Sequence, residues 1–172
     1  MNEKLKTEIN KYAIQDQYIR DLSIKFPEVK ELCSEVIHQD SLSRIFVQRV
    51  LENFGWPFIS MVGKESSHNF WLLVQHLDKD IALQKKALEL LKKAVIKNEA
   101  DSQDLAYLED RLLIAEGKEQ RYGTQYKIKD KKLVMSPVED ISNLEDRRKK
   151  MGLPSIETQL NELKVSYKNL LE

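Results

Sequence analysis

The stretch Phe70-Trp71-Leu72-Leu73-Val74-Gln75-His76-Leu77 begins with five successive apolar residues. Successive residues of an α-helix are rotated by about 100°, so five in a row point to every side of the helix. We therefore predict a central helix over residues 66–77 that is packed all round. Five apolar residues are too few to cross a membrane, which needs about 20.

Segments on both sides of this helix repeat apolar residues at helical spacing. They predict further helices, among them 4–23, 27–38, 41–53, 81–97, 102–116 and 156–171, and Asp40 or Ser41 is the expected N-cap of the helix over 41–53. The period changes to two over residues 122–135, which predicts a β-hairpin that turns at Asp130-Lys131. We expect a mainly α fold, a single-domain bundle of six or seven helices with one small hairpin.

The composition limits the classes of function. The chain has 172 residues, the size of one ordinary domain, with 28 Lys and Arg against 28 Asp and Glu. Zero net charge argues against general binding of nucleic acids or membrane surfaces. One cysteine, Cys33, cannot form an internal disulfide, and the charged first residues lack the apolar core of a signal peptide. We expect a cytoplasmic protein.

His76 is the first candidate for chemistry, because it follows the most apolar segment of the chain. A neutral imidazole there can donate or accept a proton near neutral pH, as general acid–base catalysis requires. A histidine on a core helix is also often a hydrogen-bonded packing residue. Asp78 would join His76 only if the helix breaks between them; otherwise Asp78 or Asp80 caps the next helix.

Asp110 is the second candidate, because helical spacing puts it on the same side as Ala106 and turns its carboxylate inward. A buried carboxylate needs a partner. Arg111 is the nearest cation in sequence, and His76 or Arg20 are the other candidates. A structural ion pair or a solvated charge run explains the same residues.

The third candidate is the segment Gln120-Arg121-Tyr122-Gly123-Thr124-Gln125. Its amides, phenol, hydroxyl and backbone N–H groups are suited to a polar ligand, and Gly123 would allow close approach. A plain junction between a helix and a strand explains the same residues equally well.

Two weaker candidates are charge clusters. Asp16 and Arg20 are four residues apart on one helix face, for which an ordinary surface pair is the favoured interpretation. Asp146-Arg147-Arg148 is interpreted first as a solvated helix end, with anion binding as the sharper alternative. The three histidines and Cys33 lack the spacing of a zinc site, and no nucleotide-binding or hydrolase motif occurs, so we expect no metal and no cofactor.

Several motifs, taken in order, are similar to those of an uncharacterised bacterial family, a domain of unknown function. They are Asp16-Gln17…Arg20, Gly55-Trp56-Pro57, Trp71…Gln75-His76…Asp78, Leu108…Asp110-Arg111, Gln120…Tyr122-Gly123-Thr124-Gln125 and Asp146-Arg147-Arg148…Gly152-Leu153. In the last of them the family has one more residue between Asp and Arg-Arg. The resemblance implies no activity. Because most of the shared residues are polar, it favours a polar site.

Two hypotheses follow. In the first, the protein has a pocket for a small polar molecule and is a metal-independent hydrolase or transferase. His76 would be its general acid or base, Asp110 would orient His76, and Arg111 would hold an anionic group. Ligand contacts are expected from Gln75, Gln120, Tyr122, Thr124, Gln125, Trp56 and Arg20. In the second, the protein is a non-catalytic immunity or adaptor module with a protein partner, and its polar residues form a structural network.

Overall fold

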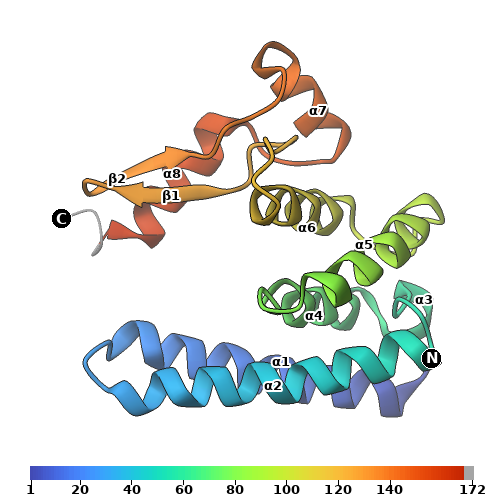
Figure 1. The fold of residues 1–172 in the computed structure, drawn as a ribbon. Coiled ribbons are helices and arrows are strands. Elements are labelled where there is room, and N and C mark those ends of the chain that lie inside the picture. Colours follow the sequence, from blue (N-terminus) through green and yellow to red (C-terminus); the bar gives the residue numbers. More distant parts are fainter. Residues whose placement is uncertain (169–172) are drawn as a thin grey trace. The chain divides into compact units, whose positions relative to one another are not determined.

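A computed structural model describes residues 1–168, and the chain divides into two compact units, Met1–Asp101 and Ser102–Glu172. The described residues form eight α-helices and one two-stranded antiparallel hairpin (Figure 1), which confirms the predicted mainly helical class. Within this part of the chain no helix is both long and apolar enough to span a membrane. The single domain stays a prediction, and each unit is described by itself.

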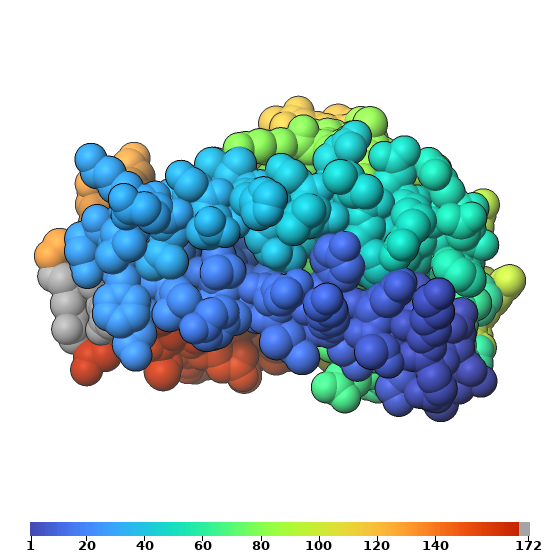
Figure 2. Space-filling model, turned by 90° about the horizontal axis from the view of Figure 1, so that it is seen from below, coloured from blue at the N-terminus to red at the C-terminus, as the bar shows by residue number. Residues whose placement is uncertain are grey.

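The first unit is built on a long antiparallel pair of helices, on which a shorter helix packs. Figure 1 shows the pair at the bottom of the view, and Figure 2 looks onto the blue and cyan surface that it forms. The elements are α1 (Glu3–Lys25), α2 (Lys30–Asn53), α3 (Ile59–Val62), α4 (Lys64–Gln75) and α5 (Ile81–Ile96).

The predicted central helix is α4, which contacts α1, α2, α3 and α5. Phe70, Leu73 and Val74 are completely buried, and Trp71 and Leu77 nearly so. Leu72 is only half-buried, so the central helix is confirmed but it is not packed on every side.

The helices predicted over 27–38 and 41–53 are one helix, α2. The separate start predicted at Asp40 or Ser41 is wrong, because neither side chain caps a helix there. The Asp40 carboxylate accepts a hydrogen bond from Arg20, and the Ser41 hydroxyl donates to the carbonyl of Ile37 one turn earlier. No Gly or Pro interrupts the chain between Lys30 and Asn53.

The turn between α4 and α5 carries the candidate histidine. His76 is the first residue after α4, and Asp80 caps α5 by accepting a hydrogen bond from the Leu83 amide at 3.0 Å. The Gln84 side-chain amide donates to the carbonyls of Val74 and Gln75 at 3.1 and 3.2 Å. Of the two predicted caps, Asp80 is the one used, and a side chain of α5 holds the end of α4.

The second unit surrounds a polar loop with short elements. These are α6 (Ser102–Ala115), β1 (Tyr126–Lys129), β2 (Lys132–Met135), the 3₁₀ helix η1 (Ile141–Asn143), α7 (Leu144–Lys150) and α8 (Ile156–Ser166). Leu105, Leu108 and Leu112 of α6, which helical spacing turns inward, are buried, whereas Ala115, expected to be buried with them, is exposed at the end of the helix. The end predicted for the last helix, at Leu171, lies outside the described residues.

The hairpin is shorter than predicted. Tyr126 pairs with Met135 and Lys129 with Lys132, so Asp130-Lys131 forms the expected turn, but residues 122–125 are not part of the strand. These residues fold into a loop instead, because the Asp110 side chain binds the backbone amides of Tyr122 and Thr124. Their alternating pattern was therefore a misleading signal.

Gly123 lies in this loop where the neighbouring side chains leave little room for a Cβ. Its φ is +66°, and an added Cβ would lie 3.1 Å from both Ile156 Cδ1 and Met135 Sδ. Gly117, at the end of α6, also has a positive φ of +72° but has nothing within 4 Å of the corresponding position. Substitution of Gly117 would therefore introduce backbone strain alone, whereas substitution of Gly123 would introduce both backbone strain and steric crowding.

We expect Gly123→Ala to lower the free energy of unfolding by about 2–4 kcal/mol, the sum of left-handed strain and overpacking. Gly117→Ala has only the strain and should cost about 1 kcal/mol. Chemical denaturation of the two variants beside the wild type gives the comparison. Equal losses would show that the packing around Gly123 is looser than described.

Candidate functional site

The imidazole of His76 is held by a buried carboxylate from α1. Its Nδ1 lies 2.8 Å from Oδ2 of Asp16, whose side chain is 1% exposed. Within residues 1–168 the ring forms no other hydrogen bond, which leaves Nε2 without a protein partner. His76 is therefore oriented by Asp16 and not by Asp110, the residue expected in that role from the sequence.

Asp16 and Asp40 share the guanidinium of Arg20. Arg20 Nε donates to Asp16 Oδ1 at 3.0 Å, and its NH2 group donates to Asp40 Oδ1. The predicted contact between Asp16 and Arg20 is confirmed, but the surface pair is wrong, because α2 and α4 pack against α1 and bury Asp16. The cluster joins α1, α2 and the turn after α4.

The charge state of Asp16 fixes the tautomer of His76. Burial acts to raise the pKa of Asp16, but the hydrogen bond and charge of His76, the charge of Arg20 and a bond from Gln17 outweigh it and lower the pKa. An ionised carboxylate has no proton to donate, so the hydrogen between the two groups sits on Nδ1. Nε2 is then a lone-pair acceptor in neutral His76.

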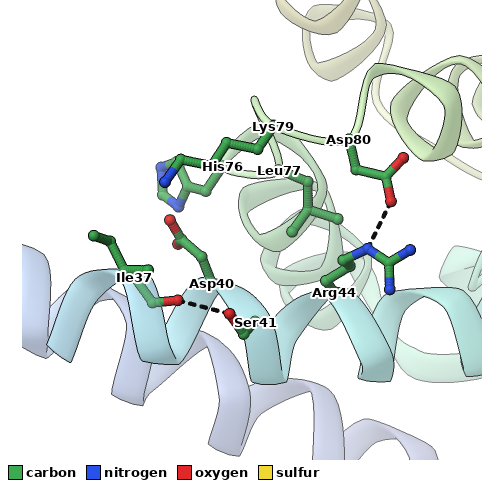
Figure 3. A pocket seen from close by; sticks show the side chains of 8 residues that line it. All are labelled: Ile37, Asp40, Ser41, Arg44, His76, Leu77, Lys79 and Asp80. Atoms are coloured by element: carbon green, nitrogen blue, oxygen red, sulfur yellow. Dashed lines mark hydrogen bonds and ion pairs between the residues drawn. The ribbon is translucent and has the colours of Figure 1, made fainter. Parts of the chain in front are cut away.

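His76 lines a small hollow between α2 and the turn that precedes α5 (Figure 3), with a cavity volume of about 90 Å³. Its lining residues are Ile37, Asp40, Ser41, Arg44, His76, Leu77, Lys79 and Asp80. Sites for drug-sized ligands usually measure about 300–1,000 Å³. The hollow therefore has room for a small head group only.

Two acidic groups of the hollow have different surroundings. Asp80 is occupied, because its carboxylate caps α5 and accepts from Arg44 Nε at 2.7 Å. Asp40 uses one oxygen for Arg20 and has no other hydrogen bond to the described residues. Burial, with the charge of Asp16, raises the pKa of Asp40 against the opposing charges of Arg20 and His76.

A larger hollow of about 460 Å³ lies in the first unit, near the start of α1 and the end of α2. The ion pair between Arg49 and Glu8, 2.9 Å long, lies in its wall. Its lining is Asn2, Lys4, Leu5, Glu8, Arg49, Val50, Asn53 and Phe54. These residues include no oriented acid–base pair, so we place the candidate site at His76.

Asp110 is completely buried in the second unit, as predicted, but its partners are backbone groups. Oδ1 accepts from the amides of Arg121 and Tyr122 at 2.7 and 3.0 Å, and Oδ2 from the amide and hydroxyl of Thr124 at 3.0 and 2.9 Å. Burial raises the pKa of Asp110 against these hydrogen bonds. The carboxylate thus closes the loop, and the cations considered from sequence are not its hydrogen-bond partners.

Arg148 and Gln120 hold the same loop from other sides. Arg148 is completely buried, and its guanidinium donates to the carbonyls of Tyr122 at 2.6 Å and Pro154 at 2.7 and 2.9 Å. Gln120 accepts from the Gln125 amide at 2.8 Å and donates to the carbonyls of Gln125 and Ser136. The N–H groups of Arg148 that could bind an anion therefore already donate to carbonyl oxygens.

The other predicted ligand residues lie in varied places. Trp56 is a core residue whose indole donates to Ser67 at 3.3 Å and packs edge-on against Phe70. Gln75 is the last residue of α4 and is half-buried, as is Arg111 on α6. Tyr122, Thr124 and Gln125 belong to the loop around Asp110. Only His76 among the predicted residues lines the hollow, with Arg20 behind it.

Sequence reasoning missed Asp40 and Lys79 in the hollow. Asp40 looked like a helix cap because an acid at the start of an apolar-periodic segment usually is one. Its position on the α2 face that meets Arg20 depends on the pairing of α1 with α2, which no local pattern encodes.

Residues 3–170 match the sequence profile of a family of unknown function, DUF6624. The chain belongs to this family. The DUF6624 match spans nearly the whole chain and includes residues from both units. Searches of curated proteins and of solved structures gave no match.

We expect Asp16→Asn to destabilise the protein by about 2–4 kcal/mol at neutral pH, because it leaves Arg20 without its buried counter-charge and the Nδ1–H of His76 without an ionised acceptor. The folded-state pKa of Asp16 is lowered, so its stabilisation is complete above the ordinary value of 3.8 and is lost as the pH falls through the folded value. Urea denaturation from pH 7 to pH 2.5 should show the gap between wild type and variant closing below about pH 4.

Asp21→Asn, at an exposed position of the same helix, is the matched control and should leave the denaturation midpoint almost unchanged. If the gap between wild type and Asp16→Asn is constant down to pH 2.5, the carboxylate of Asp16 is not the titrating group.

Asp110→Asn should cost about 2–4 kcal/mol, because the new amide NH₂ cannot accept the hydrogen bonds that one carboxylate oxygen receives. The control is Asp146→Asn, an exposed acid of α7. Thermal unfolding followed by circular dichroism measures both. A variant as stable as the wild type would contradict the structural role of Asp110.

Proposed function

We propose that the DUF6624 chain carries a small-molecule site at the hollow beside His76, and that His76 is its general acid–base group in a metal-independent hydrolysis or group transfer. The observation that carries the proposal is the contact between His76 Nδ1 and buried Asp16 Oδ2 at 2.8 Å. It leaves the opposite ring nitrogen as a basic atom at a hollow.

The arrangement suits proton transfer. Nε2 would take a proton from water or from a bound X–H group, and the imidazolium formed would be stabilised by the Asp16 carboxylate. In hydrolysis the water oxygen would bond to the electrophilic atom while that proton moves to Nε2. The bond between the electrophilic atom and the leaving group would then break as the imidazolium gives its proton to the leaving group, which restores the neutral ring.

The surroundings of the ring support the same role. His76 is 16% exposed, so its environment is dry enough to strengthen the pair with Asp16 yet reachable from the hollow. Asp40, Ser41 and Lys79 bring polar groups to the same hollow, and Ile37 and Leu77 give it apolar walls. This mixture of an apolar wall and few polar groups is typical of small-molecule sites.

The second unit supports a different role for the remaining predicted residues. The side chains of Asp110, Arg148 and Gln120 hold the loop through backbone groups. We propose that these polar residues form a structural network that fixes the loop. The contacts therefore favour the structural network of the non-catalytic hypothesis. They do not indicate a protein partner.

A thermal-shift screen with a library of small polar metabolites tests the site. Compounds that raise the melting temperature of the wild type should fail to do so with His76→Gln, and should still act on His38→Gln, whose histidine is exposed. Enzymatic turnover, where a hit is a substrate, should disappear with the same variant.

Ile37→Trp gives a second test that leaves the His76 pair intact. Ile37 is 52% exposed and lines the hollow, so a larger side chain should fill it without disturbing the core. Hits that stabilise His76→Gln or Ile37→Trp as they do the wild type would refute the site, so the test still works if one of the two variants folds poorly.

A further inference from the structure

We propose that the hollow beside His76 binds a primary ammonium head group, which would be held between Nε2 of His76 and the free carboxylate oxygen of Asp40. This inference deepens the proposed function, because it assigns a ligand class to the same site. It rests on the acceptor groups of the hollow, on the charges around them and on the size of the space.

The first support is that two atoms in the hollow, Nε2 of His76 and Oδ2 of Asp40, are hydrogen-bond acceptors without a donor from the described residues. Asp16 accepts the Nδ1 hydrogen, so Nε2 of neutral His76 is an acceptor. Arg20 occupies Oδ1 of Asp40, and Oδ2 has no hydrogen bond to residues 1–168. Both residues line the hollow, and Figure 3 shows the Asp40 carboxylate pointing toward the His76 ring. A ligand must therefore bring donors, and an ammonium group has three.

The second support is the charge balance. Asp16 and Asp40 both bind Arg20, and among residues 1–168 no other arginine or lysine forms an ion pair with either of them. Arg44 is paired with Asp80 in the same wall. With His76 neutral, two carboxylates share one guanidinium, so the hydrogen-bonded cluster of Asp16, Asp40 and Arg20 has a net charge of −1, which Lys79 in the lining of the hollow offsets without an ion pair to either carboxylate in the described part of the chain. A bound monovalent cation would balance this charge by direct contact, in competition with the ammonium of Lys79.

The third support is the size and lining of the space. A cavity of about 90 Å³ is too small for most metabolites but suits a compact head group. Ile37 and Leu77 supply apolar walls beside the acidic groups, which suits the alkyl carbon next to an ammonium nitrogen. The hollow is partly open, so the rest of such a ligand would extend into solvent.

Protonation of His76 competes with this ligand. An imidazolium supplies the missing charge from within the protein and replaces the lone pair of Nε2 with a donor. Ammonium binding therefore requires the neutral ring. The groups that face the ring and set this balance are Asp16 and Arg20 from α1, Asp40 and Arg44 from α2, and Lys79 and Asp80 from the turn.

The test is an NMR titration of the full chain with n-propylammonium, with 1-propanol and butyrate as neutral and anionic probes of similar size. Long-range ¹H–¹⁵N spectra of the histidine rings report the tautomer of His76 and its response. We expect the Nδ1–H tautomer, and a saturable shift of the Nε2 resonance with n-propylammonium that is about tenfold weaker or more with the other probes.

Two variants locate the cation. Asp40→Asn should weaken n-propylammonium binding about tenfold or more, whereas Glu31→Gln, an exposed acid of the same helix, should leave it unchanged. Lys79→Met removes a positive charge from the rim and should strengthen binding a few-fold, on the order of 1 kcal/mol or less at an exposed position. This second variant serves if Asp40→Asn does not fold.

The outcomes separate the two proposals. Equal or stronger effects of 1-propanol or butyrate on His76 would overturn the ammonium assignment and leave the site itself intact. No response of the ring to n-propylammonium would overturn the assignment too, and the thermal-shift screen would still judge the site. An Nε2–H tautomer in the free protein would overturn the orientation on which both proposals depend.

Discussion

The carboxylate of Asp16 is the group on which the first unit depends. It lies on α1 with almost no exposure to solvent, and it binds the turn after α4 through His76 and, through Arg20, reaches Asp40 on α2. A buried carboxylate is costly unless charged or hydrogen-bonded partners surround it. The three segments must therefore meet at this point, and the position of the His76 ring follows from that requirement.

The two units satisfy a buried carboxylate in different ways. Asp16 binds cationic or titratable side chains, so its surroundings respond to protonation. Asp110 binds the backbone amides of a loop, and its hydrogen-bond partners are groups that do not titrate. The first arrangement suits a site that exchanges protons, and the second suits a fixed turn. The same residue type therefore belongs to a cluster of titratable side chains in one unit and to a fixed turn in the other.

Much of the fold could be predicted because it depends on local patterns. The apolar run at Phe70 to Val74 predicted a central helix, and the cap at Asp80 was among the candidates. The candidate site depends on contacts between distant segments, such as Asp16 with His76, sixty residues apart. Helical spacing turned Asp110 inward correctly, but backbone amides carry no sequence signal, so its true partners could not be recognised.

The side chain of Gln84 gives the turn after α4 a further property. The side-chain amide of Gln84, on α5, donates hydrogen bonds to the last carbonyls of α4. At the other end of the turn, Asp80 caps the start of α5. The backbone on which the imidazole is mounted is thus clamped from both sides by α5. A backbone held in this way would reduce the entropy that the His76 ring loses when it contacts a ligand in the proposed site. In this way α5, which reaches the lining of the hollow through its N-cap, would help to preorganise the ring.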